Sequence, residues 1–267
     1  MTDARRAIFL DVDGTYALHG AVPDAHVGAV RAARAAGHKV FLCTGRPISA
    51  LPHALTAAGF DGYVASAGAY VEIAGEAIAD VNFPADLGSA LLDRLDDHDV
   101  AYIVENAEEL ILPHRAEHLL PRALRAYGGD DADVVIEIAE DFSDVPFAKV
   151  VCFGGDLPLE QILAPLGAGV AVVPNSIPDL GPGAGEVYQS HITKAVGIAA
   201  AIAALGMTRE QVVAFGDGLN DVAMLEFAAV SVAIEGSHPE VLAAATYTAA
   251  GPDQSGLAAA FRELGLT

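Results

Sequence analysis

Two pairs of carboxylates follow short apolar runs in this chain of 267 residues. Asp11 and Asp13 come directly after the run 7–10, and Asp217 and Asp221 follow a second such run. Carboxylates a few ångströms apart raise one another's pKa, so all four stay ionised only beside a compensating positive charge. A hard divalent cation is the simplest compensation, and oxygen ligands favour Mg²⁺ over Zn²⁺. The pattern predicts a magnesium site that uses all four carboxylates.

A phosphoryl group is the substrate that suits such a site. Its oxygens carry negative charge, which the metal and the ammonium of Lys194 can neutralise during transfer. Asp11 can act as the nucleophile, as carboxylates do in aspartyl-phosphate chemistry. Asp13 lies two residues further on, so its side chain could share a face with Asp11. It can then protonate the leaving oxygen and later act as a base for water.

The strands and helices that must position these residues alternate along the chain, as in an α/β fold. Short apolar runs alternate with Ala-rich helical stretches near both ends of the chain, as in βαβ units. We expect strands at 7–12, 39–43, 62–66, 212–216 and 230–234, and helices at 24–36, 48–58, 193–205, 219–228 and 238–245. They predict one doubly wound, Rossmann-like parallel sheet, whose ligands bind at the carboxyl ends of the strands.

The middle of the chain has a different sequence pattern, with longer polar stretches. We expect strands at 100–104, 133–138, 147–153 and 170–174, and helices near 86–96, 115–126 and 158–165. This is typical of an inserted α+β unit. With boundaries near Asn82 and residues 182–185, the prediction is a core of 1–81 and 186–267 and an inserted domain of 82–185.

Composition excludes several classes of partner. The 36 acidic and 14 basic side chains give a net charge of −22, which repels nucleic acid and anionic lipid. The apolar stretches are shorter than the roughly 20 residues of a membrane span, and the N-terminal run is too short for a signal peptide. We therefore expect a cytoplasmic protein with no nucleic-acid or membrane partner.

The chain resembles the haloacid dehalogenase superfamily, and within it the Cof-like phosphatases with a C2B-type cap. The order and spacing of five segments carry the resemblance. They are residues 10–15 (LDVDGT), 44–47 (TGRP), 66–69 (SAGA), Lys194, and 216–225 (GDGLNDVAML).

The resemblance implies roles for individual residues. Asp11 would be the nucleophile, Asp13 the acid and base, Lys194 the charge neutraliser and Asp217 a magnesium ligand. Asp221 would be a further ligand or would support the ligands, and the main-chain carbonyl of Asp13 would complete the metal shell. The phosphate group would be bound by Thr44, Gly45, Lys194 and Asn220. The inserted domain would be the cap.

The same resemblance makes Ala67 a departure, because the family usually has Asn at this position. The change removes a polar group expected near the phosphate or the cap hinge. We interpret Arg46 as structural, at a helix start or in an interdomain contact. Arg115, Arg122 and Arg125 lie on one expected helix, where a solvated basic face and a contact to an anionic substrate both remain open.

The expected activity is the Mg²⁺-dependent hydrolysis of a small phosphorylated metabolite, with sugar phosphates as the leading class by resemblance. A phosphomutase is an alternative, because the same residues could return the phosphoryl group to a second hydroxyl. A phospholigand sensor with an inactive core is another, although a pure binder needs neither the nucleophile nor the acid.

Overall fold

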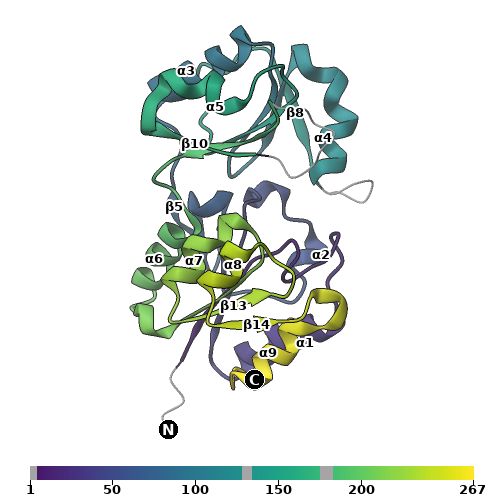
Figure 1. The fold of residues 1–267 in the computed structure, drawn as a ribbon, viewed down its shortest axis with the longest axis vertical. Coiled ribbons are helices and arrows are strands. Elements are labelled where there is room, and N and C mark those ends of the chain that lie inside the picture. Colours follow the sequence, from purple (N-terminus) through teal and green to yellow (C-terminus); the bar gives the residue numbers. More distant parts are fainter. Residues whose placement is uncertain (1–4, 128–133, 175–182) are drawn as a thin grey trace. The chain divides into compact units, whose positions relative to one another are not determined.

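The computed structural model describes residues 5–127, 134–174 and 183–267 (Figure 1). The chain forms two compact units. The first consists of Met1–Arg46, Leu51–Ala79 and Thr193–Thr267, and the second of Pro47–Ala50 and Asp80–Ile192. The second unit is therefore an insertion into the first.

The first unit is built on an eight-stranded sheet in the order β14-β13-β12-β1-β2-β3-β4-β5. The strands from β14 to β3 run parallel, and β4 pairs antiparallel with β3. The bounds are β1 Ala7–Leu10, β2 Lys39–Cys43, β3 Gly62–Ala65, β4 Tyr70–Ile73, β5 Glu76–Asp80, β12 Val212–Gly216, β13 Val230–Ile234 and β14 Tyr247–Ala249.

Helices cover both faces of this sheet (Figure 1). The central strand β1 is fully buried, with Ile8 and Leu10 in one hydrophobic cluster and Ala7 and Phe9 in the other. The first cluster includes residues of α1 and α9, and the second includes residues of α6, α7 and α8. The bounds are α1 Asp24–Ala35, α2 His53–Thr56, α6 Lys194–Ala204, α7 Val222–Phe227, α8 Pro239–Ala244 and α9 Gly256–Glu263. Burial on both faces explains why the central strands β1, β2 and β12 are almost continuously apolar.

The second unit has a six-stranded sheet in the order β10-β11-β9-β6-β7-β8. Its bounds are β6 Ala101–Glu105, β7 Leu110–Pro113, β8 Ile136–Ala139, β9 Lys149–Phe153, β10 Val170–Pro174 and β11 Gly185–Gln189. Helices α3 (Ala85–Asp97) and α5 (Leu159–Leu163) pack on one face, and α4 (Leu120–Tyr127) lies on the other (Figure 1).

The predicted fold class is confirmed, with a doubly wound core and an inserted α+β unit. The helix expected at 48–58 was wrong in extent. The chain there forms a 3₁₀ turn at Ile48–Ala50 and then the short α2, because Pro52 precedes α2 with an extended backbone (ψ 147). The strands β4, β5, β7, β11 and β14 and the helix α9 were not predicted.

The two units divide at different residues from those predicted. The observed divisions follow Ala79 and Ile192, whereas the expected domain ended at residue 185. The reason is β11, which pairs with β9 and β10 and so extends the second sheet to Gln189. Residue 133, the first of the strand predicted at 133–138, and residue 182, at a predicted boundary, lie outside the described residues.

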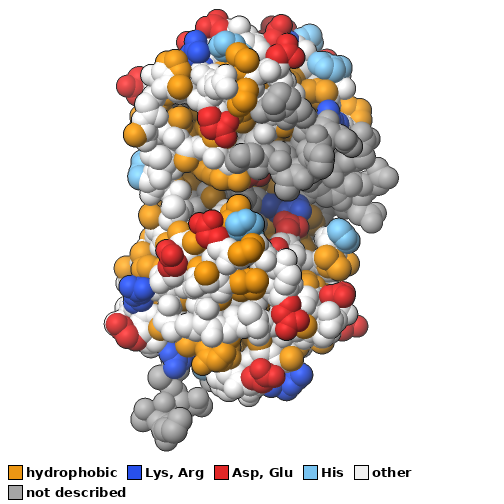
Figure 2. Space-filling view, in the orientation of Figure 1, with side chains coloured by type: hydrophobic (Ala, Val, Ile, Leu, Met, Phe, Trp, Pro, Cys, Tyr) orange, Lys and Arg blue, Asp and Glu red, His pale blue; other side chains and the backbone are white. Residues whose placement is uncertain are grey.

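Within the part of the chain that the structure describes, none of the helices combines the length and apolar character needed to cross a bilayer. On the face drawn in Figure 2, acidic side chains are scattered over each unit rather than gathered in one patch. On this face the large negative charge is thus a general property of the surface.

The turn after β3 has an unusual backbone. Ser66 and Ala67 adopt φ values of 48° and 55°, in the left-handed region that side chains other than Gly, Asn and Asp rarely occupy. The amide of Ala67 donates to the carbonyl oxygen of Thr44 at 3.0 Å, which holds the turn against the end of β2. Ala67 therefore carries backbone strain that Asn or Gly would relieve.

We expect Ala67→Gly to raise the free energy of unfolding by about 1 kcal/mol, because Gly adopts positive φ without a Cβ clash. The matched control is Ala69→Gly, two residues away, where φ is −71°. Gly there should lower stability by about 0.5–1 kcal/mol through the entropy of the unfolded chain. Urea unfolding of both variants checks this, and equal signs for the two changes would contradict it.

Asp61 ties the start of β3 to β2 and α1. Its carboxylate accepts hydrogen bonds from Lys39 Nζ at 2.6 Å, Arg34 Nε at 2.9 Å and the Val40 amide at 3.1 Å. Burial alone would raise the pKa of Asp61, but the hydrogen bonds from Lys39 and Arg34 outweigh it and lower the pKa. A depressed folded-state pKa stabilises the protein above the unfolded-state pKa, and this contribution is lost as the pH falls through the folded value.

Asp61→Asn is expected to lower the free energy of unfolding by about 1–2 kcal/mol at pH 7. The difference from wild type should begin to shrink below about pH 4, the ordinary pKa of an aspartate in an unfolded chain, and continue to shrink as the pH falls toward the lower folded-state pKa. Urea unfolding between pH 3 and 7 tests the prediction. A difference that does not change with pH would show that the charge of Asp61 has no role in stability.

Candidate active site

The central strands bring the two acidic segments to one edge of the first sheet. β1 and β12 are parallel neighbours with Leu10 opposite Phe215, and the Asp11 amide donates to the Phe215 carbonyl oxygen at 2.9 Å. Asp11 and Asp217 thus follow the carboxyl ends of adjacent strands. This edge is where ligands bind in doubly wound sheets.

Lys194 lies between two carboxylates. Its Nζ is 2.5 Å from Asp11 Oδ1 and 2.5 Å from Asp221 Oδ1. Lys194 is 1% exposed, Asp221 0% and Asp11 7%. The lysine is the first residue of α6, which the side chain of Thr193 caps. A buried ammonium shared by two acids is therefore the electrostatic centre of the site.

Burial and charge set the protonation of these groups. Burial raises the pKa of Asp11 well above its usual range, Asp221 adds to the effect, and Lys194 opposes it. Burial alone would lower the pKa of Lys194, but Asp11 and Asp221 outweigh it, so this pKa is raised. Burial also raises the pKa of Asp217. The lysine stays charged, and the carboxylates lack enough positive charge around them.

The donor set fits a divalent cation. One carboxylate oxygen each from Asp11, Asp217 and Asp221 lies within 4.8 Å of the others. Three acids face a single ammonium, and hard oxygen donors are those that Mg²⁺ prefers. These three residues could hold the ion predicted from the sequence.

Asp217 is positioned by the turn after β1. Thr15, which is fully buried, donates from Oγ1 to Asp217 Oδ1 at 2.7 Å. Gly14 has φ +90°, and a Cβ there would lie 2.3 Å from Asp217 Oδ2. Only glycine therefore leaves room for the carboxylate. Sequence reasoning missed the role of Thr15, although its place directly after Gly14 was the available signal.

Asp221 organises the loop that carries Asp217. Its Oδ2 accepts hydrogen bonds from the amides of Asp217 and Gly218 at 3.0 and 2.9 Å. A Cβ on Gly216 would lie 2.6 Å from the Cβ of Asp221, so the loop folds closely over this side chain. With Oδ1 bound to Lys194, most of the acceptor capacity of Asp221 is used within the protein.

The carboxylate of Asp13 lies apart from the three clustered carboxylates. Arg46 Nε donates to Asp13 Oδ2 at 2.8 Å and Nη2 donates to Oδ1 at 2.9 Å. The Asp13 side chain is 51% exposed. The sequence grouped four carboxylates, whereas three come together and the fourth is bound to an arginine. Arg46 had been interpreted as structural, and its contact with Asp13 was not foreseen.

The predicted phosphate-binding residues surround the same edge. Thr44, which is 2% exposed, follows β2, and its Oγ1 accepts a hydrogen bond from the Arg46 amide at 3.1 Å. A Cβ on Gly45 would lie 3.6 Å from the Asn220 side-chain nitrogen. Gly45 and Asn220 are thus neighbours, although they are 175 residues apart in sequence.

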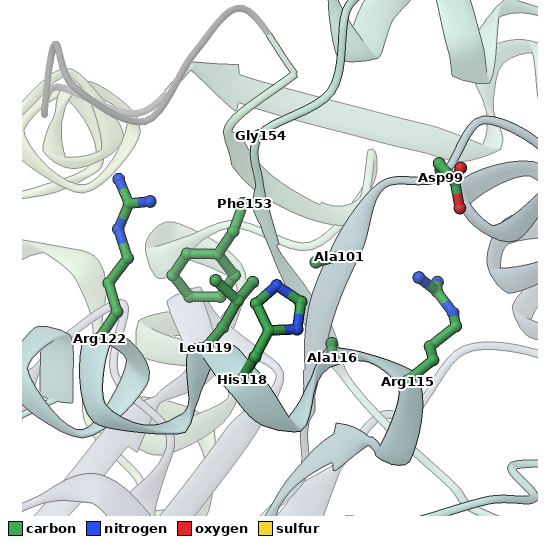
Figure 3. Close-up of a pocket in the computed structure, with 9 residues that line it drawn as sticks. All are labelled: Asp99, Ala101, Arg115, Ala116, His118, Leu119, Arg122, Phe153 and Gly154. Atoms are coloured by element: carbon green, nitrogen blue, oxygen red, sulfur yellow. The ribbon is translucent and has the colours of Figure 1, made fainter.

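The predicted basic helix lines a separate cavity within the second unit. This cavity of about 340 Å³ is lined by Arg115 and Arg122, which lie on either side of His118, and by Phe153 (Figure 3). Arg115 already pairs with Asp96, donates to the Val100 carbonyl oxygen at 3.0 Å and lies over the Tyr102 ring. Arg115 thus makes several contacts within the second unit. The side chain of Arg125 lies outside the described residues.

Two curated proteins have sequences similar to this chain over almost all of its length. YkrA of Bacillus subtilis, which is named as a phosphatase, is 26% identical over 264 residues, 98% of this chain and 98% of that protein. A Streptococcus pyogenes protein named as a bifunctional phosphatase and peptidyl-prolyl cis-trans isomerase is 26% identical over 98% of this chain. The chain spans about half (54%) of the length of this second relative.

A solved structure with the same fold also resembles this chain. The subclass IIB sugar phosphatase BT4131 superposes with a TM-score of 0.82 at 25% identity, over 98% of this chain and 100% of that one. The haloacid dehalogenase-like hydrolase family matches residues 8–261, which include every motif that carries the resemblance. The resemblance is thereby confirmed, and the chain belongs to the haloacid dehalogenase-like hydrolases.

Proposed function

We propose that the protein is a Mg²⁺-dependent phosphomonoesterase that forms an aspartyl-phosphate on Asp11. The observation that supports this most directly is the Asp11 carboxylate, which lies beside a buried ammonium and within a group of three acids. A nucleophile that meets a dianionic phosphate needs such positive charge around it. The named phosphatases among the relatives are consistent with this reaction.

Asp11, Asp217 and Asp221 would hold the magnesium ion. When bound, it supplies charge neutralisation for the phosphoryl oxygens. The raised pKa of Asp11 fits this requirement, because a cation beside the carboxylate favours its ionised, nucleophilic form. Lys194 adds a permanent positive charge at the same carboxylate.

The remaining steps use the side chains of the chain. Asp11 attacks phosphorus, the bond from phosphorus to the ester oxygen breaks, and Asp13 donates a proton to the leaving alkoxide. Asp13 then accepts a proton from water, the water oxygen attacks the aspartyl-phosphate, and inorganic phosphate leaves with Asp11 restored. Thr44, Gly45 and Asn220 would bind the phosphate oxygens.

We further propose a small sugar phosphate as the substrate class, supported by the 25% identity to a sugar phosphatase. The second unit would act as the cap that selects the organic part of the substrate. Its place in the chain, inserted between the segments that carry Thr44 and Lys194, is consistent with this role.

We expect phosphate release from some member of a panel of phosphorylated sugars, nucleotides and small cofactors, with Mg²⁺ and not with EDTA. Asp11→Asn should lower turnover by at least about 1,000-fold, because the nucleophile is lost. Asp217→Ala should raise the Mg²⁺ concentration needed for half-maximal activity. Asp24→Asn, the same kind of change in the first turn of α1, is the matched control and should retain wild-type turnover.

Near-wild-type turnover by the Asp11→Asn variant would refute the assignment of Asp11 as the nucleophile. An isomerised phosphoester in phosphorus NMR, in place of inorganic phosphate, would instead identify a phosphomutase. Saturable binding of a phosphate ester without turnover would identify a phospholigand sensor.

The role of Lys194 can be tested without measuring activity. In EDTA, Lys194→Met should lower the free energy of unfolding by about 3 kcal/mol, because it leaves Asp11 and Asp221 buried without their cation. Adding Asp11→Asn should restore part of this loss, so that the double mutant is at least about 1 kcal/mol more stable than the sum of the single changes.

The matched control is Lys39→Met, which removes a partly exposed lysine paired with Asp61 and should cost less than about 1 kcal/mol. Urea unfolding gives all these values. If the changes in unfolding free energy at positions 11 and 194 were strictly additive, the two side chains would not interact electrostatically.

A further inference from the structure

Arg46 binds both oxygens of the Asp13 carboxylate. Nε and Nη2 donate to Oδ2 and Oδ1 at 2.8 and 2.9 Å, which is the parallel, two-point geometry of a strong arginine–carboxylate pair. Two N–H groups of one planar guanidinium, each directed at a different oxygen, define both the place and the plane of the carboxyl group. The contact therefore fixes the position and orientation of the Asp13 carboxyl group.

The backbone of Arg46 is fixed at both of its polar groups. Its amide donates to Thr44 Oγ1 at 3.1 Å, and its carbonyl oxygen accepts from the Ser66 amide at 2.8 Å. β1 and β2 are parallel neighbours, with Leu10 opposite Leu42, so Asp13 and Arg46 both follow the carboxyl ends of adjacent strands. The guanidinium is thus delivered to Asp13 by a rigid strand end.

We propose that Arg46 is a positioning residue for Asp13 in the reaction. It keeps this carboxylate apart from the carboxylates of Asp11, Asp217 and Asp221, and it orients Asp13 for proton transfer. This inference rests on the proposed function. The pair is partly exposed, with the Asp13 side chain at 51% and the Arg46 side chain at 21%, so it can open when Asp13 transfers its proton.

Two classes of ester separate this role from others. An alkyl phosphate, such as a hexose 6-phosphate, needs a proton on its leaving oxygen, whereas 4-nitrophenyl phosphate releases a stable phenolate without one. A residue that positions the acid should therefore matter for the alkyl ester alone. A residue that binds the phosphate group, or that only supports the fold, should affect both esters equally.

The experiment compares kcat/KM of the two esters for wild type, Arg46→Met, Asp13→Asn and the double mutant. Arg46→Met should lower the value for the alkyl phosphate by between about 10- and 100-fold and that for the aryl phosphate by less than about 3-fold. In the Asp13→Asn background, Arg46→Met should cause no further loss. Arg46→Lys keeps the charge but not the two-point contact, and should restore only part of the activity.

Arg34→Met is the matched control. Arg34 also pairs with an aspartate, Asp61, at 2.9 Å, but at the amino ends of β2 and β3, on the opposite edge of the sheet. It should leave the ratio of the two esters unchanged. Mg²⁺ binding measured by calorimetry should be the same for Arg46→Met and wild type, which checks that the metal-binding carboxylates are intact.

Equal losses for both esters, or a further loss on top of Asp13→Asn, would overturn the positioning role and leave the proposed function standing. If the wild-type protein hydrolysed neither the alkyl nor the aryl phosphate, the proposed function and this inference would both be overturned. A loss confined to the alkyl ester supports both.

Discussion

Lys194 places a buried ammonium 2.5 Å from both Asp11 and Asp221, and this charge allows two carboxylates to lie almost out of contact with water. Removing an ionised carboxylate from water costs several kcal/mol unless an opposite charge lies beside it. The three residues come from the end of β1, the start of α6 and the loop after β12. The packing of these distant segments therefore depends on the balance between one ammonium and two carboxylates. The carboxylate of Asp217 adds a further negative charge, which a bound cation would offset.

Two glycines of the first unit allow Lys194 to reach the acids, because they let α6 pack very closely against the turn after β3 and against β3 itself. A Cβ on Gly68 would lie 2.1 Å from the Thr193 carbonyl oxygen, and a Cβ on Gly197 would lie 2.5 Å from Val64. The strained turn at Ser66 and Ala67 precedes the first of these contacts. The turn after β3 is thus the surface against which the start of α6 packs.

The sequence predicted the strand ends that carry the acids because buried parallel strands have an apolar pattern and share one edge. It did not predict β5, whose residues are mostly exposed and so lack this pattern. It also missed the short helix α9, although Leu257, Ala260 and Phe261 are buried there at helical spacing. Thr15 and Arg46 were missed as partners of Asp217 and Asp13 for a different reason. Their contacts depend on side-chain directions after turns, as with Gly14 at φ +90°. The place of Thr15 directly after Gly14 indicates a turn, but it does not give these directions.

The end of β1 at Leu10 also separates two acids that are only two residues apart. Asp11 is buried beside an ammonium, whereas the Asp13 side chain is half exposed and paired with a guanidinium. An alternating strand would have placed both side chains on one face, but β1 ends at Leu10, before either acid. Different environments are what allow two carboxylates in one site to take different roles, one as a nucleophile and one as a proton carrier. The proposed division of labour between Asp11 and Asp13 therefore rests on where the strand ends.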